Sequence, residues 1–309
     1  MNKKSVVSII LQGIFLVIII LCTQNIFAQG KTRIEDKLRI PDSGHVQLLT
    51  THDGSMNIGR IIEIGESEIT FKTDLGKLTI SISKIKEIKE ISATSIKNGE
   101  YWFTNPNATR LFFAPTAYTL KQGKGYFADY YVFFPAFAYG LTDKVTIGGG
   151  MSLLPGVDLD KQIFYFTPKV GLKAIGNFNL ALGALLIKIP EFSDDEDSPD
   201  DDSPLIGILY GVSTFGKPDG NVTMGLGFGF VGDELADKPM ICFGGEKRLS
   251  RRLSLVTENW IFPGFGNPLI SCGIRFFGEK LSTDLALMNT LGEDMIFPGV
   301  PYIDFVFAF

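Results

Sequence analysis

Apolar and polar residues alternate with a period of two along most of the chain, which is the pattern of β-strands with two different faces. In the stretch from residue 44 to 91, Ile69 and Phe71 alternate with polar neighbours, and Leu78, Ile80 and Ile82 do the same. Turn signals separate these short runs, at Asp53-Gly54, Gly65-Glu66 and Leu75-Gly76. The pattern predicts four or five short strands, each with one buried and one solvated face.

So many strands in so few residues imply a small and strongly bent sheet. The segment VQLLTTHDGSMNIGRIIEIGESEITFKTDLGKLTISISKIKEI resembles the SH3-like and Sm-like small β-barrels, through Asp53-Gly54, Gly59 and the spaced isoleucines. Sm-type proteins bind RNA, but the balanced charge of this segment argues against that role here. We therefore expect a small β-domain over residues 43–95 and, from its Asn, Gly and Pro residues, a linker over 96–108.

Beyond Thr109 the composition shifts to glycine, phenylalanine and tyrosine, and no helical period is sustained. The alternation predicts twelve strands, near residues 109–118, 125–139, 144–154, 162–174, 177–188, 205–215, 220–231, 238–247, 252–262, 267–278, 280–289 and 300–309. In one of them, Val222, Met224 and Leu226 share a face that is opposed by Gly225 and Gly227. A membrane barrel requires such an apolar outer face, with small or polar residues inside.

A soluble β-sandwich also shows alternation, but it would rarely pack glycine on an inner face. Connection lengths supply a second test, because membrane barrels have short periplasmic turns and longer outer loops. Counted back from the C-terminus, the expected periplasmic turns at 278–279, 248–251, 216–220, 176–177 and 140–144 are short. The expected outer connections at 263–268, 291–300 and 191–204 are mostly longer.

The last residues, DFVFAF, resemble the C-terminal assembly signal of outer-membrane barrels, in which a terminal aromatic residue closes an amphipathic strand. The fold class expected is all-β: a small N-terminal β-barrel-like domain followed by a twelve-stranded antiparallel transmembrane β-barrel over residues 109–309. The expected location is the outer membrane, with the N-terminal domain in the periplasm.

The N-terminus fits export. Lys3 and Lys4 precede an apolar run from Ile14 to Cys22, and the segment Asn25-Ile26-Phe27-Ala28-Gln29 follows it, which predicts a signal peptide over residues 1–28, cleaved after Ala28, and a short N-terminal segment over 29–42. A membrane anchor is the alternative, but the run is shorter than the ~20 apolar residues needed to cross a bilayer. A lipoprotein at Cys22 is the other alternative, and Leu21 is bulky for its recognition sequence.

Composition excludes several kinds of chemistry. The net charge of −5 becomes −7 when Lys3 and Lys4 leave with the acid-free signal peptide. Seven acids lie between Asp194 and Asp202, so the rest of the mature chain is neutral overall. No basic patch is left for nucleic acid. With two histidines, His45 and His52, and no CxxC or HExxH motif, we expect no cofactor and no metal site, and we interpret both histidines as loop or edge residues. The acidic run has no EF-hand spacing, which favours a solvated outer loop over a weak calcium site.

Strand alternation also predicts which charged residues face the lumen: Arg110, Asp129, Lys169, Lys173, Glu246, Glu258, Arg275, Asp284 and Asp304. These four basic and five acidic residues should pair across a narrow interior, because an unpaired charge away from water is costly. We expect Arg275 to reach both Glu258 and Asp284.

The leading interpretation is a non-enzymatic barrel, either structural or a narrow channel, in contact with outer-membrane lipid. An outer-membrane phospholipase of the Ser–His type would need a histidine in the barrel, and none lies beyond His52. Acid–base work by Glu258 and Asp284 is an alternative to ion pairing. The alternative function is a membrane-anchored module whose N-terminal domain binds a periplasmic protein partner. The sequence identifies neither a solute nor that partner.

Overall fold

The computed structural model describes residues 33–172, 175–190, 204–292 and 297–309. The predicted signal peptide, residues 29–32, Lys173 and residues 191–203 of the acidic loop lie outside the described residues. The chain divides into two compact units, one ending at Trp102 and the other spanning Phe103–Phe309. Among the described residues, no helix is long and apolar enough to span a membrane.

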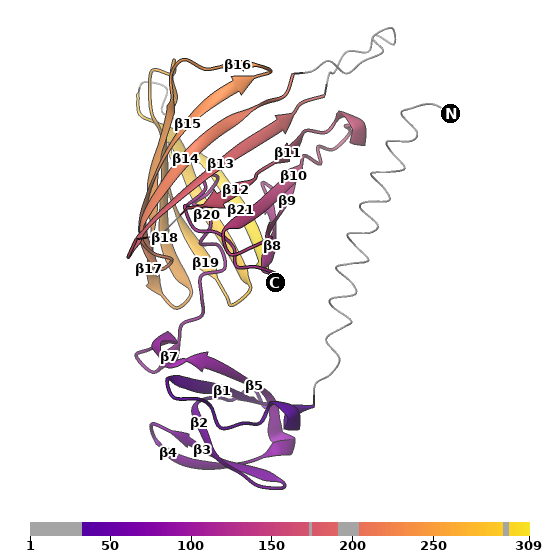
Figure 1. The fold of residues 1–309 in the computed structure, drawn as a ribbon, viewed down its shortest axis with the longest axis vertical. Helices are drawn as coiled ribbons and strands as arrows, with labels where there is room; N and C mark the ends of the chain where they lie inside the picture. The colour runs from indigo at the N-terminus through magenta and orange to yellow at the C-terminus, as the bar shows by residue number, and fades with distance from the viewer. Residues whose placement is uncertain (1–32, 173–174, 191–203, 293–296) are drawn as a thin grey trace, which may run out of the picture. The chain divides into compact units, whose positions relative to one another are not determined.

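The first unit is built on an antiparallel five-stranded sheet in the order β4-β3-β2-β1-β5 (Figure 1). The strands are β1 (His45–Thr51), β2 (Met56–Ile64), β3 (Glu68–Thr73), β4 (Gly76–Ser81) and β5 (Ile85–Ser92). The remaining elements are the 3-10 helices η1 (Ile34–Lys37), η2 (Ile82–Lys84) and η3 (Ala93–Ser95) and the short strands β6 (Ile96–Lys97) and β7 (Glu100–Tyr101).

Apolar residues on one face of this sheet form its core, with Leu49, Ile61, Ile69 and Phe71 at most 1% exposed. The buried face predicted for Ile69 and Phe71 is therefore confirmed. Leu78 is 40% exposed, however, because β4 lies at the edge of the sheet and has no strand beyond it. Closure of the five strands into an SH3-like or Sm-like barrel stays a prediction.

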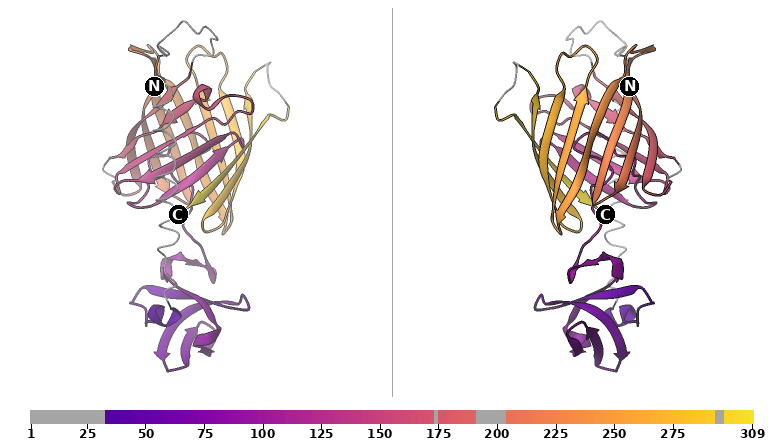
Figure 2. Two further views of the ribbon diagram at one scale, coloured as in Figure 1. Left: turned by 90° about the vertical axis from the view of Figure 1, so that its right-hand side faces the viewer. Right: turned by 90° about the vertical axis from the view of Figure 1, so that its left-hand side faces the viewer.

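The second unit is a closed antiparallel barrel (Figures 1 and 2). Its strands are β8 (Gly125–Tyr130), β9 (Phe134–Gly140), β10 (Val145–Met151), β11 (Phe164–Phe166), β12 (Lys169–Gly171), β13 (Phe178–Lys188), β14 (Ile206–Lys217), β15 (Gly220–Val231), β17 (Met240–Ser250), β18 (Leu253–Ile261), β19 (Leu269–Phe277), β20 (Leu281–Thr290) and β21 (Val300–Ala308). The short β16 (Glu234–Leu235) pairs only with β15.

Twelve strand positions surround the lumen, because β11 and β12 pair with the same two neighbours, β10 and β13, and form one interrupted strand. Pro168 lies at the interruption, where a residue without an N–H cannot extend the ladder of hydrogen bonds. The β21–β8 pair closes the ring. The predicted twelve-stranded antiparallel barrel is thus confirmed.

Two members of the predicted strand set are wrong, and their errors cancel in the count. Residues 125–139 form two strands, because the chain reverses at Tyr131 and Val132, whose φ angles are 54° and 69°. The sequence gives little sign of this turn, since residues at such angles are usually Gly, Asn or Asp. Residues 109–118 form no strand of the wall and lie inside the barrel instead.

The two faces of the wall differ as the alternation predicts. On β15, Val222, Met224 and Leu226 point outward and are 66%, 59% and 47% exposed, while Asn221 and Thr223 are buried inside. The same outward exposure holds for apolar residues around the ring: Phe127, Phe137, Phe166, Val170, Leu182, Leu209, Phe243, Leu255, Phe276, Leu285, Phe305 and Phe307. The exterior is therefore an apolar surface far larger than one soluble monomer normally exposes.

The two ends of the barrel have connections of different length. At one end, here the short-turn end, the strands are joined by residues 141–144, 172–177, 218–219, 251–252 and 278–280. At the other, the long-loop end, the connections include residues 152–163, 189–205, 262–268 and 291–299. The predicted difference between the ends is confirmed, although the β8–β9 turn at the long-loop end is short.

Candidate functional site

Residues 103–120, here called the plug, run inside the barrel. The chain starts at the short-turn end, where Arg248 Nη1 donates a 2.8 Å hydrogen bond to the Phe103 carbonyl. It turns back on itself between Arg110 and Pro115, with the Leu111 N–H bonded to the Ala114 carbonyl at 2.8 Å. It then returns to start β8, so the plug is a hairpin inserted into one half of the lumen.

Arg275 joins three strands of the wall to the plug. Its side chain is fully buried and donates two 2.7 Å hydrogen bonds to Asp284 and one of 2.7 Å to Glu246. The guanidinium also donates to plug carbonyls, those of Asn107 at 2.9 Å and Leu111 at 2.6 Å. Bidentate pairing and five donors in a fixed plane make arginine well suited to this position.

Glu258 holds the tip of the plug. Its Oε2 accepts hydrogen bonds from three consecutive backbone N–H groups, those of Phe112 at 2.8 Å and of Phe113 and Ala114 at 2.9 Å. Its Oε1 accepts from Trp260 Nε1 at 2.8 Å. Consecutive backbone N–H groups that converge on one oxygen in this way stabilise an anion without a cation. The expected Arg275–Glu258 pair is therefore not present, because the backbone of the plug occupies that carboxylate.

A third attachment lies on the other side of the tip. Arg110 Nη2 donates to Asp304 Oδ2 at 2.6 Å, and its other terminal nitrogen donates to the Phe112 carbonyl. Tyr302 donates its hydroxyl to the same Asp304 oxygen at 2.7 Å. The Phe113 ring packs 4.8 Å from the Tyr302 ring, measured between centroids. Charge pairing and aromatic packing thus hold one short turn from several directions.

The returning arm of the plug is held by hydroxyl groups and by one lysine. Thr214 Oγ1 accepts from the Ala117 N–H at 2.8 Å, and Thr146 Oγ1 accepts from the Leu120 N–H at 2.9 Å. Lys169 Nζ donates to the carbonyls of Thr109 and Thr116, both at 3.0 Å, and so bridges the two arms of the hairpin. These polar side chains take the place of a neighbouring strand, since buried backbone groups need partners.

Most of the nine charged residues proposed for the lumen lie together inside the barrel. The buried ones are Arg110, Lys169, Glu246, Glu258, Arg275, Asp284 and Asp304. Asp129 is placed differently: it pairs with the outward-facing Phe305, on the face of β8 opposite to Tyr126 and Ala128. The inward position predicted for Asp129 from strand alternation is therefore wrong. Lys173 lies outside the described residues.

Arg248 was missed from the predicted set. It is 6% exposed, pairs with Asp219 at 2.8 Å, and lies over the rings of Phe103 and Phe277 at 5.2 Å and 4.6 Å. The alternation carried the necessary signal, because Arg248 is two residues from the inward-facing Glu246. The predicted strand ended at residue 247, one position too early, whereas β17 continues to Ser250.

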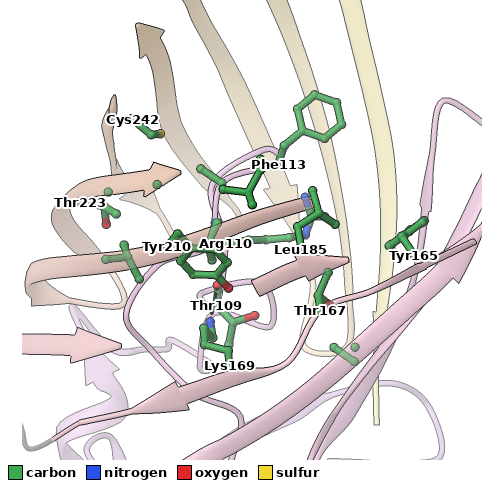
Figure 3. Close-up of a pocket in the computed structure, with 18 of the residues that line it drawn as sticks. Thr109, Arg110, Phe113, Tyr165, Thr167, Lys169, Leu185, Tyr210, Thr223 and Cys242 are labelled. Carbon is green, nitrogen blue, oxygen red and sulfur yellow. Dashed lines mark hydrogen bonds between the residues drawn. The ribbon is translucent and has the colours of Figure 1, made fainter. Parts of the chain in front are cut away.

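Beyond the tip of the plug, toward the long-loop end, lies a cavity of about 380 Å³, here called the outer cavity. Apolar and aromatic side chains dominate its lining, among them Tyr126, Tyr165, Leu185, Ile208, Tyr210 and Met240. Figure 3 shows Lys169 and Thr109 side by side at its boundary, with Tyr210 and Leu185 around the same space.

Glycine on the wall keeps this space open. A Cβ built on Gly183 would lie 2.4 Å from the Tyr210 hydroxyl, and one on Gly150 would lie 2.4 Å from the Tyr165 hydroxyl. Both rings therefore lie against bare backbone. Inward-facing Gly225 and Gly227 lie on the neighbouring strand β15, where Gly227 pairs with Tyr210, and add no side chain to the lining. The glycines that marked the lumen face in the sequence thus have a structural use, which is to make room inside a small barrel.

No protein-family model matches the chain, and no curated protein matches it. Among solved structures, it is similar to outer-membrane expressed OmpT of Vibrio cholerae, at 11% identity over 88% of this chain and 100% of that chain, with a TM-score of 0.32. It is also similar to Salmonella typhi OmpF in complex with daunomycin (11% identity, 86% and 95% covered, TM-score 0.31) and to a mutant porin of Rh. blastica (11%, 86% and 97%, 0.32). Similarities this low show no family and carry no inference about function.

Proposed function

We propose that this chain is an outer-membrane barrel that is closed to free solute passage by its own plug. The membrane location is supported by the apolar exterior, the polar interior and the unequal connections at the two ends, which together satisfy the requirements of a lipid-embedded barrel. A closed ring also pairs every strand edge, so no backbone donor of the wall has to face lipid.

The observation that carries the closed state is the buried Arg275, bonded at once to Glu246, Asp284 and three plug carbonyls. This buried arrangement is stable only while the plug is in place, because the carboxylates of the wall and the carbonyls of the plug share the Arg275 cation as their partner. Reconstitution of the chain in planar bilayers tests the proposal. The expected result is no steady conductance, and large stable channels in the unmodified protein would refute it.

A non-enzymatic role belongs to the same proposal. Glu258 and Asp284, the carboxylates considered as an acid–base pair, are buried and accept hydrogen bonds at both of their oxygens: Glu258 from backbone amides and Trp260, and Asp284 from Arg275. A catalytic base needs a free lone pair within reach of a substrate proton. Both carboxylates are instead used to hold the plug.

The second candidate function is binding of a periplasmic protein by the N-terminal unit. It is favoured by apolar side chains that the sheet leaves exposed, namely Met56 at 59%, Ile64 at 43% and Leu78 at 40%. A periplasmic location is supported by the start of the plug at the short-turn end of the barrel, because the short turns of such barrels face the periplasm. Leu78→Glu should abolish co-purification of a defined envelope protein, whereas Lys77→Glu should not. Equal capture by both variants would contradict this role.

A further inference from the structure

The outer cavity has the size and lining of a ligand site. Its volume of about 380 Å³ falls within the roughly 300–1,000 Å³ typical of small-molecule pockets. Leu185, Ile208 and Met240 supply aliphatic surface, and four tyrosines also line the cavity. An apolar chain would be stabilised by leaving water for this space, because burial of its CH₂ groups is favourable.

Lys169, a charged residue at the boundary of the cavity, differs from the other buried cations in its bonding partners. Three buried cations have carboxylate partners: Arg110 pairs with Asp304, Arg248 with Asp219, and Arg275 with Glu246 and Asp284. Lys169 is 5% exposed and lines the cavity, and no ion pair in the described part of the chain includes it.

The ammonium of Lys169 also has bonding capacity left. In its protonated form Lys169 carries three N–H donors, and the two carbonyls of Thr109 and Thr116 use two of them. A buried cation held only by neutral carbonyls is costly, and an anion placed beside it would offset much of that cost. The position of Lys169 on the cavity lining makes such an approach possible from the long-loop side.

We propose that the outer cavity binds a single-tailed amphiphile with a carboxylate head, the head at Lys169 and the tail among Leu185, Ile208, Met240 and the tyrosines. The inference rests on the proposed closed barrel, because the plug supplies Thr109 and Thr116 and forms the inner limit of the cavity. The ligand enters from the long-loop end, since the plug occupies the other half of the lumen.

Three probes with the same ten-carbon tail separate the contribution of the head from that of the tail: decanoate, decanol and decyltrimethylammonium. They are titrated calorimetrically into the full chain in nanodiscs of zwitterionic lipid, with empty nanodiscs subtracted. We expect decanoate to bind at least about ten-fold more tightly than decanol, and the cation to bind most weakly. Equal affinity for decanoate and decanol would overturn the role of Lys169 and leave a purely apolar site.

Variants locate the site. Lys169→Met keeps the length of the side chain but removes its charge, and should lower decanoate affinity about ten-fold while decanol affinity stays within about two-fold. Lys217→Met, at an exposed lysine near the short-turn end, is the matched control and should change neither. Leu185→Trp should fill the cavity and weaken both probes, which tests the site even if Lys169→Met fails to fold.

The thiol of Cys242 gives an independent readout, because Cys242 lines the cavity and Cys272 is exposed on the outer face of β19. In the full chain with Cys22→Ser and Cys272→Ser, decanoate should slow maleimide labelling of Cys242. Unchanged labelling at saturating decanoate would overturn the proposed place of binding. Conductance of the same preparation separates the two proposals: a closed barrel that binds no probe refutes the ligand site alone, whereas an open barrel refutes the proposed function.

Discussion

Replacing Arg275 with alanine removes the cation that connects β17, β19 and β20 to the plug. Glu246 and Asp284 would then lie buried without a counter-charge, at 4% and 0% exposure, and the carbonyls of Asn107 and Leu111 would lose their donors. Breaking a buried pair in this way costs ~3–5 kcal/mol, and each stranded carbonyl adds ~1–3 kcal/mol if it stays dry. These terms do not add, because neighbouring groups relax together.

Release of the plug is the relaxation that the structure allows, since it would let water reach both carboxylates. The bonds of Glu258 to the plug tip oppose release, and hydrogen bonds to a charged group are worth about 1.5–3 kcal/mol each. The opposing terms are similar in size, so Arg275→Ala should populate both plugged and unplugged states. We expect a lower unfolding temperature together with intermittent ion conductance.

The assay combines thermal unfolding with single-channel recording in planar bilayers. Arg252→Ala, at an exposed arginine in the β17–β18 turn, is the control and should behave like the wild type. Replacing all three charges, as Arg275→Met with Glu246→Gln and Asp284→Asn, should recover much of the lost stability, because no buried charge is then unpaired. The reasoning is refuted if Arg275→Ala changes neither stability nor conductance while the wild type conducts strongly.

Glu258→Gln should loosen the plug tip, because an amide bonds the N–H groups of residues 112–114 more weakly than a carboxylate does. In bilayer recordings, this variant should open more often than the control Glu234→Gln. Leu226→Arg on the outer face should lower the free energy of unfolding, measured by urea titration in lipid, by about 2–4 kcal/mol. Gly225→Ala should lower it much less, because no atom lies closer than 3.7 Å to the added Cβ. Equal losses in the two variants would contradict the assignment of faces. Gly183→Ala should push the Tyr210 ring into the outer cavity and weaken decanoate binding, an effect absent from Gly225→Ala. In the N-terminal unit, the hydrogen bonds from Thr51 and Ser55 lower the pKa of Asp53 below its ordinary value. The stabilisation from these bonds is therefore present above the ordinary pKa and is lost as pH falls through the lowered pKa. Thr51→Val should raise the pKa of Asp53 in an NMR titration.

How far the interior could be predicted depends on which residues are compared. Glu246, Arg275, Asp284 and Asp304 were assigned to the lumen from alternation alone, because side chains of a strand must take opposite faces. Asp129 was assigned to the lumen by the same rule, but the structure gives Tyr126 and Ala128 the inward face of β8 and places Asp129 on the other face. The partner of each charge was beyond the sequence: Glu246 lies two strands away from Arg275, and its pairing depends on the curvature of the ring.

Periodicity, glycine placement and connection length by themselves determined an all-β chain with a twelve-stranded barrel, an apolar exterior and two unequal ends, because these are local properties of strands and turns. Only the tertiary structure decided that residues 103–120 enter the lumen. Their backbone amides and carbonyls find partners on side chains of seven different wall strands, among them Lys169, Glu258 and Arg275, and no pattern along the chain encodes such contacts. The tertiary structure likewise decided that the free half of the lumen is an apolar cavity beside Lys169, which has no carboxylate partner in the described part of the chain, since both the volume and the lining of the cavity depend on where the plug stops.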